Sequence, residues 1–103
     1  MSVITDVVII MSCYEEAIND FNMILGDIPA SRNQQVRRIG NYDDFGGNKA
    51  TSIDVYGAAF NFVPPQQIIE TAEKVKWKYP QYIAIYINSE NNDEIILWTP
   101  TKV

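Results

Sequence analysis

The order of apolar patterns along the 103-residue chain predicts an α+β fold of the ferredoxin-like type, with element order β-α-β-β-α-β and one further C-terminal strand. This prediction is based on three observations. Two segments have a helical apolar stripe, several short segments are rich in β-branched and aromatic residues, and proline and glycine separate these segments. Because each helix has a single stripe, both are expected on one face of a mostly antiparallel sheet. The length and the hydrophobic fraction of 47% predict one domain, residues 1–103.

The first two elements are expected close to the N-terminus. Residues 3–11 predict a strand, because β-branched residues are frequent there and both alternating faces are apolar in its middle. Ser12 then stands in a position typical of a helix N-cap, and Glu15, three residues later, completes a capping-box pattern. The helix that follows is expected to end at Gly26, since glycine is favoured directly after a helix.

Two strands are expected next, the first over residues 34–42, followed by a tip rich in turn-forming residues. The second, residues 50–63, is long and has a defect in its alternation. Ile53 and Val55 have one parity, whereas Phe60 and Phe62 have the other. An extra residue is needed to bring them to one face, so we expect a β-bulge near residues 57–59.

A second helix is expected between two prolines. Pro65 suits its first turn, and Pro80 closes it. Residues 82–87 and 94–99 predict the last two strands, which a polar turn joins. The buried side of this helix is expected to consist of Ile68, Ile69, Ala72, Val75 and Tyr79.

The chain contains no histidine and one cysteine, Cys13. Histidine titrates near neutral pH and is the commonest metal ligand, so Ser-His-Asp catalysis, Cys-His catalysis and histidine-containing zinc sites are excluded. A single cysteine excludes an intrachain disulfide and a Cys-x-x-Cys redox motif. We therefore expect no enzymatic activity, no cofactor and no metal centre.

Charge and the N-terminal segment restrict the partners. Thirteen acidic and eight basic residues give a net charge of −5, which argues against binding to duplex nucleic acid. The N-terminus lacks the positive segment of a targeting sequence, and the apolar run 7–11 is too short to cross a bilayer. We expect a cytoplasmic protein that binds no membrane, and an unpaired Cys13 fits a reducing compartment.

The best carboxylate group for Mg²⁺ or for general acid–base chemistry is Asp43, Asp44 and Asp54. Adjacent side chains point apart in an extended segment, and the solvation of a polar loop explains these residues better. Residues 46–49, Gly-Gly-Asn-Lys, have the composition of a phosphate cradle. They lie between two predicted strands instead of at a helix N-terminus, which favours a hairpin turn.

Alternation within the predicted strands leaves one face of the sheet without helices. If Ile83, Ile85 and Ile87 point toward the helices, Tyr82 and Tyr86 point away from them. Nothing in a two-layer fold covers such a face, and exposed patches rich in tyrosine and tryptophan mark interaction sites, although rings with polar tips also tile open sheets. In the last strand, alternation exposes either Ile96 and Trp98 or their neighbours on this face. The residues expected on this helix-free face are Val8, Ile10, Tyr56, Tyr82, Tyr86 and Trp98, of which the four aromatic ones would anchor a protein partner or a second copy of the chain.

Three short motifs, GGNK (46–49), VYGAAFN (55–61) and WKYP (77–80), resemble a pattern of small uncharacterised α+β proteins of phages and bacteria. The resemblance spans residues 40–99 and implies no catalytic residue and no ligand. It implies a context in which small acidic proteins inhibit or neutralise something larger. For a phage-encoded protein, the expected location is the host cytoplasm.

Three functions are considered, in this order. The first is a small cytosolic binding protein, of the phage anti-defence inhibitor or immunity type, that occludes a partner macromolecule. The second is a module that sequesters a nucleotide or another small molecule at a dimer interface, with aromatic rings stacking a base and cations pairing with a phosphate. The third is a metal-dependent phosphoesterase that uses the three aspartates. The residues expected at the nucleotide site are Tyr42, Phe45, Tyr56, Trp98, Arg37, Arg38 and Lys49.

Overall fold

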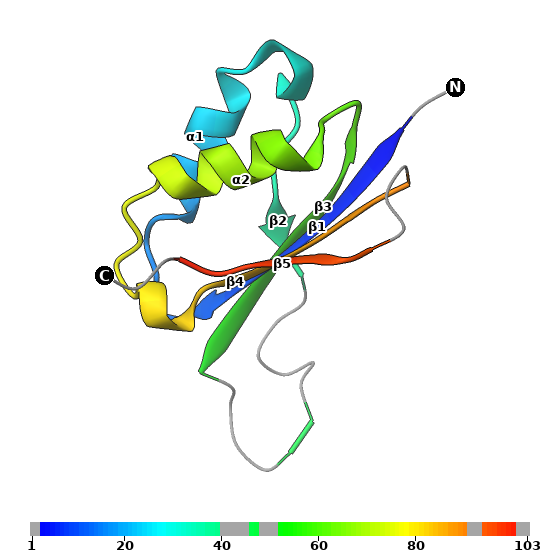
Figure 1. The fold of residues 1–103 in the computed structure, drawn as a ribbon. Coiled ribbons are helices and arrows are strands. Elements are labelled where there is room, and N and C mark those ends of the chain that lie inside the picture. Colours follow the sequence, from blue (N-terminus) through cyan, green and yellow to red (C-terminus); the bar gives the residue numbers. More distant parts are fainter. Residues whose placement is uncertain (1–2, 40–45, 48–51, 91–93, 101–103) are drawn as a thin grey trace.

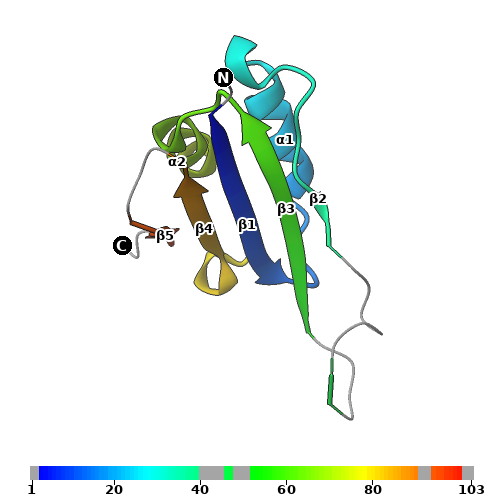
Figure 2. The ribbon, with the colours of Figure 1, turned by 90° about the vertical axis from the view of Figure 1, so that its right-hand side faces the viewer.

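One antiparallel sheet carries two helices on one of its faces. The computed structural model describes residues 3–39, 46–47, 52–90 and 94–100, and this part of the chain contains five paired strands. Figures 1 and 2 show both helices on the same side of the sheet. The predicted α+β class, with two helices and an antiparallel sheet, is confirmed.

Strand β1 (Ile4–Ser12) lies at the centre of the sheet. It pairs on one side with β3 (Ile53–Asn61) and on the other with β4 (Ala84–Ser89). Two short strands form the edges, β2 (Arg37–Arg38) beside β3 and β5 (Ile96–Trp98) beside β4. The strand order is therefore β2-β3-β1-β4-β5.

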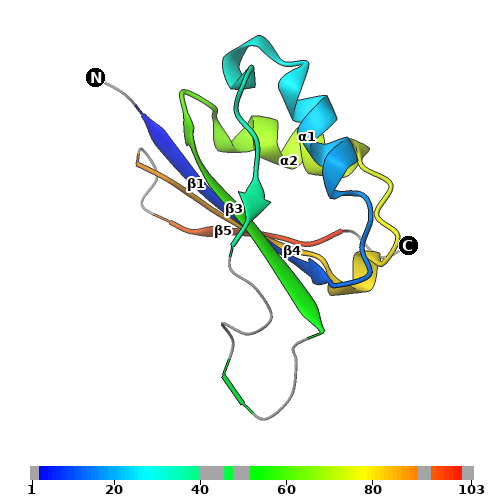
Figure 3. The same ribbon diagram turned by 180° about the vertical axis from the view of Figure 1, so that it is seen from behind.

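Helix α1 (Ile18–Gly26) follows β1, and helix α2 (Pro65–Lys74) follows β3. Two 3-10 turns, η1 (Pro29–Ser31) and η3 (Pro80–Tyr82), lie in the connections. Figure 3 shows the two helices next to each other on one side of the sheet. Pro65 occupies the first turn of α2 as predicted, because a missing N–H costs nothing at that position.

The core lies between the helices and one face of the sheet. Val7, Ile9 and Met11 of β1 and Ile85 and Ile87 of β4 are each at most 1% exposed. The prediction that Ile85 and Ile87 point toward the helices is confirmed. The helices contribute Ile18, Phe21, Leu25, Ile68 and Ala72.

The bulge predicted in the long strand is wrong. β3 pairs residue for residue with β1 throughout residues 53–61, from Asn61 opposite Ile4 to Ile53 opposite Ser12. Phe60 is buried on the helix side, while Ile53 lies on the opposite face. In this register the Ile53 and Val55 side chains belong to the helix-free face, so the strand needs no extra residue.

The first helix begins at Ile18, later than the sequence pattern predicted. Ser12 is the last residue of β1, and its pairing with β3 holds it in an extended conformation. Its Oγ accepts the N–H of Tyr14 at 3.2 Å, so it caps a turn and not the helix. The N–H of Ala17, which precedes α1, is donated instead to the carboxylate of Glu15 at 3.1 Å.

Other boundaries also differ from the prediction. Helix α2 ends at Lys74, so Tyr79 lies outside it, and Tyr82 belongs to η3 instead of the next strand. Between α1 and β3, the described residues form a strand only at 37–38, and residues 40–42 lie outside the described part. Pairing with β3 is confined to residues 37–38 in β2, and the extended backbone of Val75 ends α2.

Candidate functional site

The register between strands assigns each strand residue to one face of the sheet. On the helix-free face, one row of neighbours crosses all five strands. Its members, from edge to edge, are Arg37, Gly57, Val8, Tyr86 and Leu97. The positions predicted for Val8 and Tyr86 are thereby confirmed.

A second row lies beside the first. Ile10 pairs with Val55 on one side and with Ala84 on the other, and Ile39 extends the row, because its N–H donates to the Val55 carbonyl at 2.7 Å. Among the described residues, no element covers either row. We define the sheet patch as Val8, Ile10, Ile39, Val55, Tyr86 and Leu97.

The sheet patch is apolar, and three of its side chains are open to solvent. Leu97 is 73% exposed, Ile39 50% and Ile10 38%. The side chain of Ile39 lies over Gly57, since a Cβ on Gly57 would meet the Ile39 Cδ1 atom at 2.6 Å. Ile39 therefore covers backbone that glycine leaves bare and makes the patch continuous across β3. A continuous apolar surface of this kind is typical of an interaction site.

Two of the predicted anchors lie on the other face. Tyr56 is opposite Ile9, and Trp98 is opposite Ile85, so both point to the helix side and pack against the core. Trp98 lines a hollow together with Trp77 and other residues at the end of α2. The prediction failed because β3 and β5 are apolar in both parities, so alternation alone could not show which side faces the helices.

Tyr82 is exposed at one end of the sheet. It lines a cleft of about 280 Å³ that lies where the end of β1, the start of β3 and η3 meet. The lining residues are Ser12, Tyr14, Ser52, Ile53, Tyr79 and Tyr82, which we call the tyrosine cleft. Ser12 pairs with Ile53 directly beyond the pair of Ile10 and Val55, so the cleft adjoins the sheet patch.

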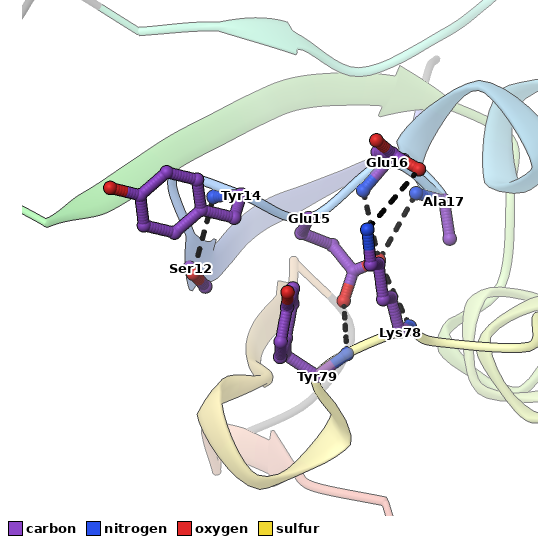
Figure 4. A network of polar contacts seen from close by, with 7 residues as sticks. All are labelled: Ser12, Tyr14, Glu15, Glu16, Ala17, Lys78 and Tyr79. Carbon is purple, nitrogen blue, oxygen red and sulfur yellow. Dashed lines mark hydrogen bonds and ion pairs between the residues drawn. The ribbon is translucent and has the colours of Figure 1, made fainter.

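A buried carboxylate fixes two walls of this cleft. Glu15 is 9% exposed, and its Oε2 accepts the N–H groups of Glu16 at 3.0 Å, Ala17 at 3.1 Å and Lys78 at 3.0 Å. Its Oε1 accepts the N–H of Tyr79 at 2.9 Å (Figure 4). We call these four hydrogen bonds the Glu15 clamp. Since hydrogen bonds to a charged acceptor are strong, the clamp holds together segments that are 63 and 64 residues apart.

The charged candidates have different surroundings. Arg38 forms an ion pair with Asp54, at 3.0 Å between Nη2 and Oδ1. Arg37 is exposed on the helix-free face, opposite Gly57. Tyr56 and Trp98 lie on β3 and β5, with β1 and β4 between these strands, so the described residues do not bring the two rings together for one nucleotide.

Several predicted site residues lie outside the described part of the chain. They are Tyr42, Asp43, Asp44, Phe45 and Lys49. Of the Gly-Gly-Asn-Lys motif, the structure describes only residues 46–47, which are exposed. In the described residues, no group of three cysteine or carboxylate side chains is arranged to hold a metal ion.

Sequence reasoning misses the Glu15 clamp and most of the tyrosine cleft. The local pattern indicates only a capping box for Glu15, because its partners at positions 78 and 79 are distant in sequence. The same kind of pattern puts Tyr79 on the buried side of a helix. The available signal is the pair of tyrosines near Pro80, since proline favours a turn at this point of the chain.

Comparisons with protein-family models, with curated proteins and with solved structures found no match to this chain. None of the described helices is long and apolar enough to span a membrane. The candidate functional site consists of two adjoining surfaces, the sheet patch and the tyrosine cleft.

Proposed function

We propose that the chain is a small binding protein that uses its sheet patch to cover a surface of a partner protein, in the manner of an inhibitor or an immunity protein. The observation that carries the proposal is the apolar row from Val8 to the strongly exposed Leu97, which no element in the described part of the chain covers. Burial of apolar surface drives protein association, and contiguous exposed patches are rare on surfaces without a partner. The proposed activity is binding without catalysis.

The size of the face suits a small interface. β1 has nine residues and β4 has six, so the common face is about 20–30 Å long at roughly 3.3 Å per residue. Five strands about 4.8 Å apart make it roughly 20–25 Å wide. The flat area is on the order of 500 Å², and side-chain relief increases it toward the roughly 600 Å² per partner of the smaller specific interfaces.

The charges around the sheet patch indicate the chemistry of the partner. Asp6 is exposed on the helix-free face, and exposed Glu90 and Glu94 flank the same end of the sheet, where β1 begins and β4 ends. Glu90 is held there by the N–H of Ile4, which donates to its Oε1 at 2.5 Å. A complementary partner has an apolar centre with basic residues on one side, because opposite charges at the rim accelerate association and fix the orientation.

We also infer that the chain has a ferredoxin-like split β-α-β topology, extended by β5 at one edge of the sheet. The order β2-β3-β1-β4, with one helix after β1 and the other after β3, supports it. In such a two-layer fold, one face of the sheet is free for a partner.

The test compares the wild-type chain with Leu97→Asp and Met23→Asp in affinity capture from extracts of the source cells. Both substitutions place a charge at a strongly exposed site, since Leu97 is 73% and Met23 69% exposed, but Met23 lies on α1. We expect Leu97→Asp to reduce capture of the partner at least tenfold, roughly the effect of losing a hot spot, and Met23→Asp to retain it.

Equal retention by the two variants would contradict the proposal, as would equal loss. Circular dichroism is the folding control, because exposed substitutions usually change stability by less than about 0.5 kcal/mol. Sedimentation of the purified chain distinguishes self-association from binding to a different protein. If the wild type self-associates and Leu97→Asp does not, the patch belongs to a second copy and the partner part of the proposal is wrong.

A further inference from the structure

The tyrosine cleft has an aromatic and uncharged lining. Three of its six lining residues are tyrosines, and none of the six carries a charge. Tyr14 is 71% and Tyr82 59% exposed, so both rings are accessible. Tyr79 is half-buried, and the Lys78 Nζ atom lies 5.6 Å from the centre of its ring. A ligand would therefore contact mainly Tyr14 and Tyr82.

The walls of the cleft are held in place before any ligand arrives. The Glu15 clamp fixes the backbone of Tyr79 beside the segment that carries Tyr14. In η3, the N–H of Tyr82 donates to the carbonyl of Tyr79 at 3.0 Å. The N–H of Cys13 donates to the Ser52 carbonyl at 2.9 Å and closes the end of the β1 and β3 pair. Preorganisation of this kind lowers the entropy cost of binding.

The lining predicts the chemistry of the ligand. Tyrosine rings present flat apolar faces, and their hydroxyl groups donate hydrogen bonds. None of the six lining side chains can pair with a phosphate or a carboxylate, and the nearby Lys78 ammonium lies against the Tyr79 ring and forms an ion pair with Glu16. Its volume of about 280 Å³ is slightly below the range of sites that enclose a drug-sized molecule. These properties fit a chain segment that lies across the cleft and inserts one or two rings.

We propose that the tyrosine cleft binds an extended, proline-containing segment of another protein in the polyproline II conformation. A polyproline II segment makes no internal hydrogen bonds, so its carbonyl groups are free to accept from tyrosine hydroxyls. Its pyrrolidine rings are apolar and rigid, and they pack against aromatic faces with little loss of entropy. The hydrogen-bonding groups are complementary, because the tyrosine hydroxyls of the cleft donate and the carbonyl groups of the segment accept. This proposal does not depend on the sheet patch.

The experiment is a titration of the ¹⁵N-labelled chain with a capped oligoproline peptide, followed by two-dimensional amide NMR spectra. A glycine-serine peptide of equal length and adenosine monophosphate are titrated in parallel. We expect saturable shifts with oligoproline alone, confined to the amides of residues 12–14, 52–53, 79 and 81–83. Tyr82→Ala should weaken binding at least about tenfold, as loss of an interface anchor does. Tyr82→Phe keeps the ring and should weaken it about fivefold.

Leu97→Asp is the matched control, because it alters the sheet patch and leaves the cleft lining unchanged. It should bind oligoproline as the wild type does. The proposal is overturned if oligoproline causes no localised shifts, if the glycine-serine peptide causes the same ones, or if Tyr82→Ala binds normally. Saturable binding of adenosine monophosphate at these amides in place of oligoproline would assign the cleft to a nucleotide instead.

Discussion

Replacing Glu15 by glutamine should destabilise the fold far more than the same change at its neighbour Glu16. The Glu15 carboxylate is 9% exposed and accepts four backbone N–H groups. The Glu16 side chain is 78% exposed, and its ion pair with Lys78 is 3.6 Å long. Both side chains are carboxylates, but Glu15 binds the backbone of residues 78 and 79, whereas Glu16 forms an exposed ion pair with Lys78.

The magnitude follows from the two oxygens of the carboxylate. Glutamine keeps one acceptor oxygen, and the best orientation places it at the Oε2 position, where three N–H groups donate. The N–H of Tyr79 then faces an NH₂ group and loses its acceptor, which costs about 1.5 kcal/mol or more. Each remaining bond loses its charged acceptor, about 0.5 kcal/mol apiece. The free energy of unfolding should fall by about 3 kcal/mol.

Urea denaturation followed by circular dichroism measures this difference. A loss of about 3 kcal/mol corresponds to a fall in Tm of about 12 °C for a domain of this size. Glu16→Gln should change the free energy of unfolding by less than about 0.5 kcal/mol, because exposed ion pairs contribute little. If the free energies of unfolding of the two variants differ by less than about 0.5 kcal/mol, the Glu15 clamp does not hold the two segments together and the prediction is wrong.

Two further predictions concern the faces of the sheet. Trp98→Ala should lower the free energy of unfolding by about 2 kcal/mol, since the indole packs against the core, whereas Leu97→Ala should change it by less than about 0.5 kcal/mol. Denaturation of the two variants checks this, and the reverse order would mean that the assigned faces are exchanged. Gly57→Ala should cost up to about 1 kcal/mol, because its Cβ would lie 2.6 Å from Ile39 Cδ1 and 3.2 Å from the Val7 carbonyl oxygen. In an Ile39→Ala background that cost should become smaller, and an unchanged cost in a double-mutant cycle would show that Ile39 does not lie over Gly57.

The sequence by itself determined the order of the elements and part of the faces. Proline marked the start of α2, and the single apolar stripe of each helix indicated which side is buried. In β4, strict alternation of isoleucine with other residues was enough to place Ile85 on the helix side and Tyr86 on the free face. The absence of histidine likewise excluded whole classes of catalytic site, because no fold can supply a side chain that the chain lacks.

Only the tertiary structure decided the faces of β3 and β5 and the existence of the cleft. Residues 53–60 and 96–98 are apolar in both parities, so a period of two residues cannot identify the buried side. Their pairing with β1 and β4 makes that choice: it buries Phe60, packs the half-buried Trp98 against the core and leaves Leu97 exposed. The Glu15 clamp joins segments that are distant in the chain, and a local pattern carries no information about such a contact. Long-range pairing therefore decided where the surfaces available for binding lie.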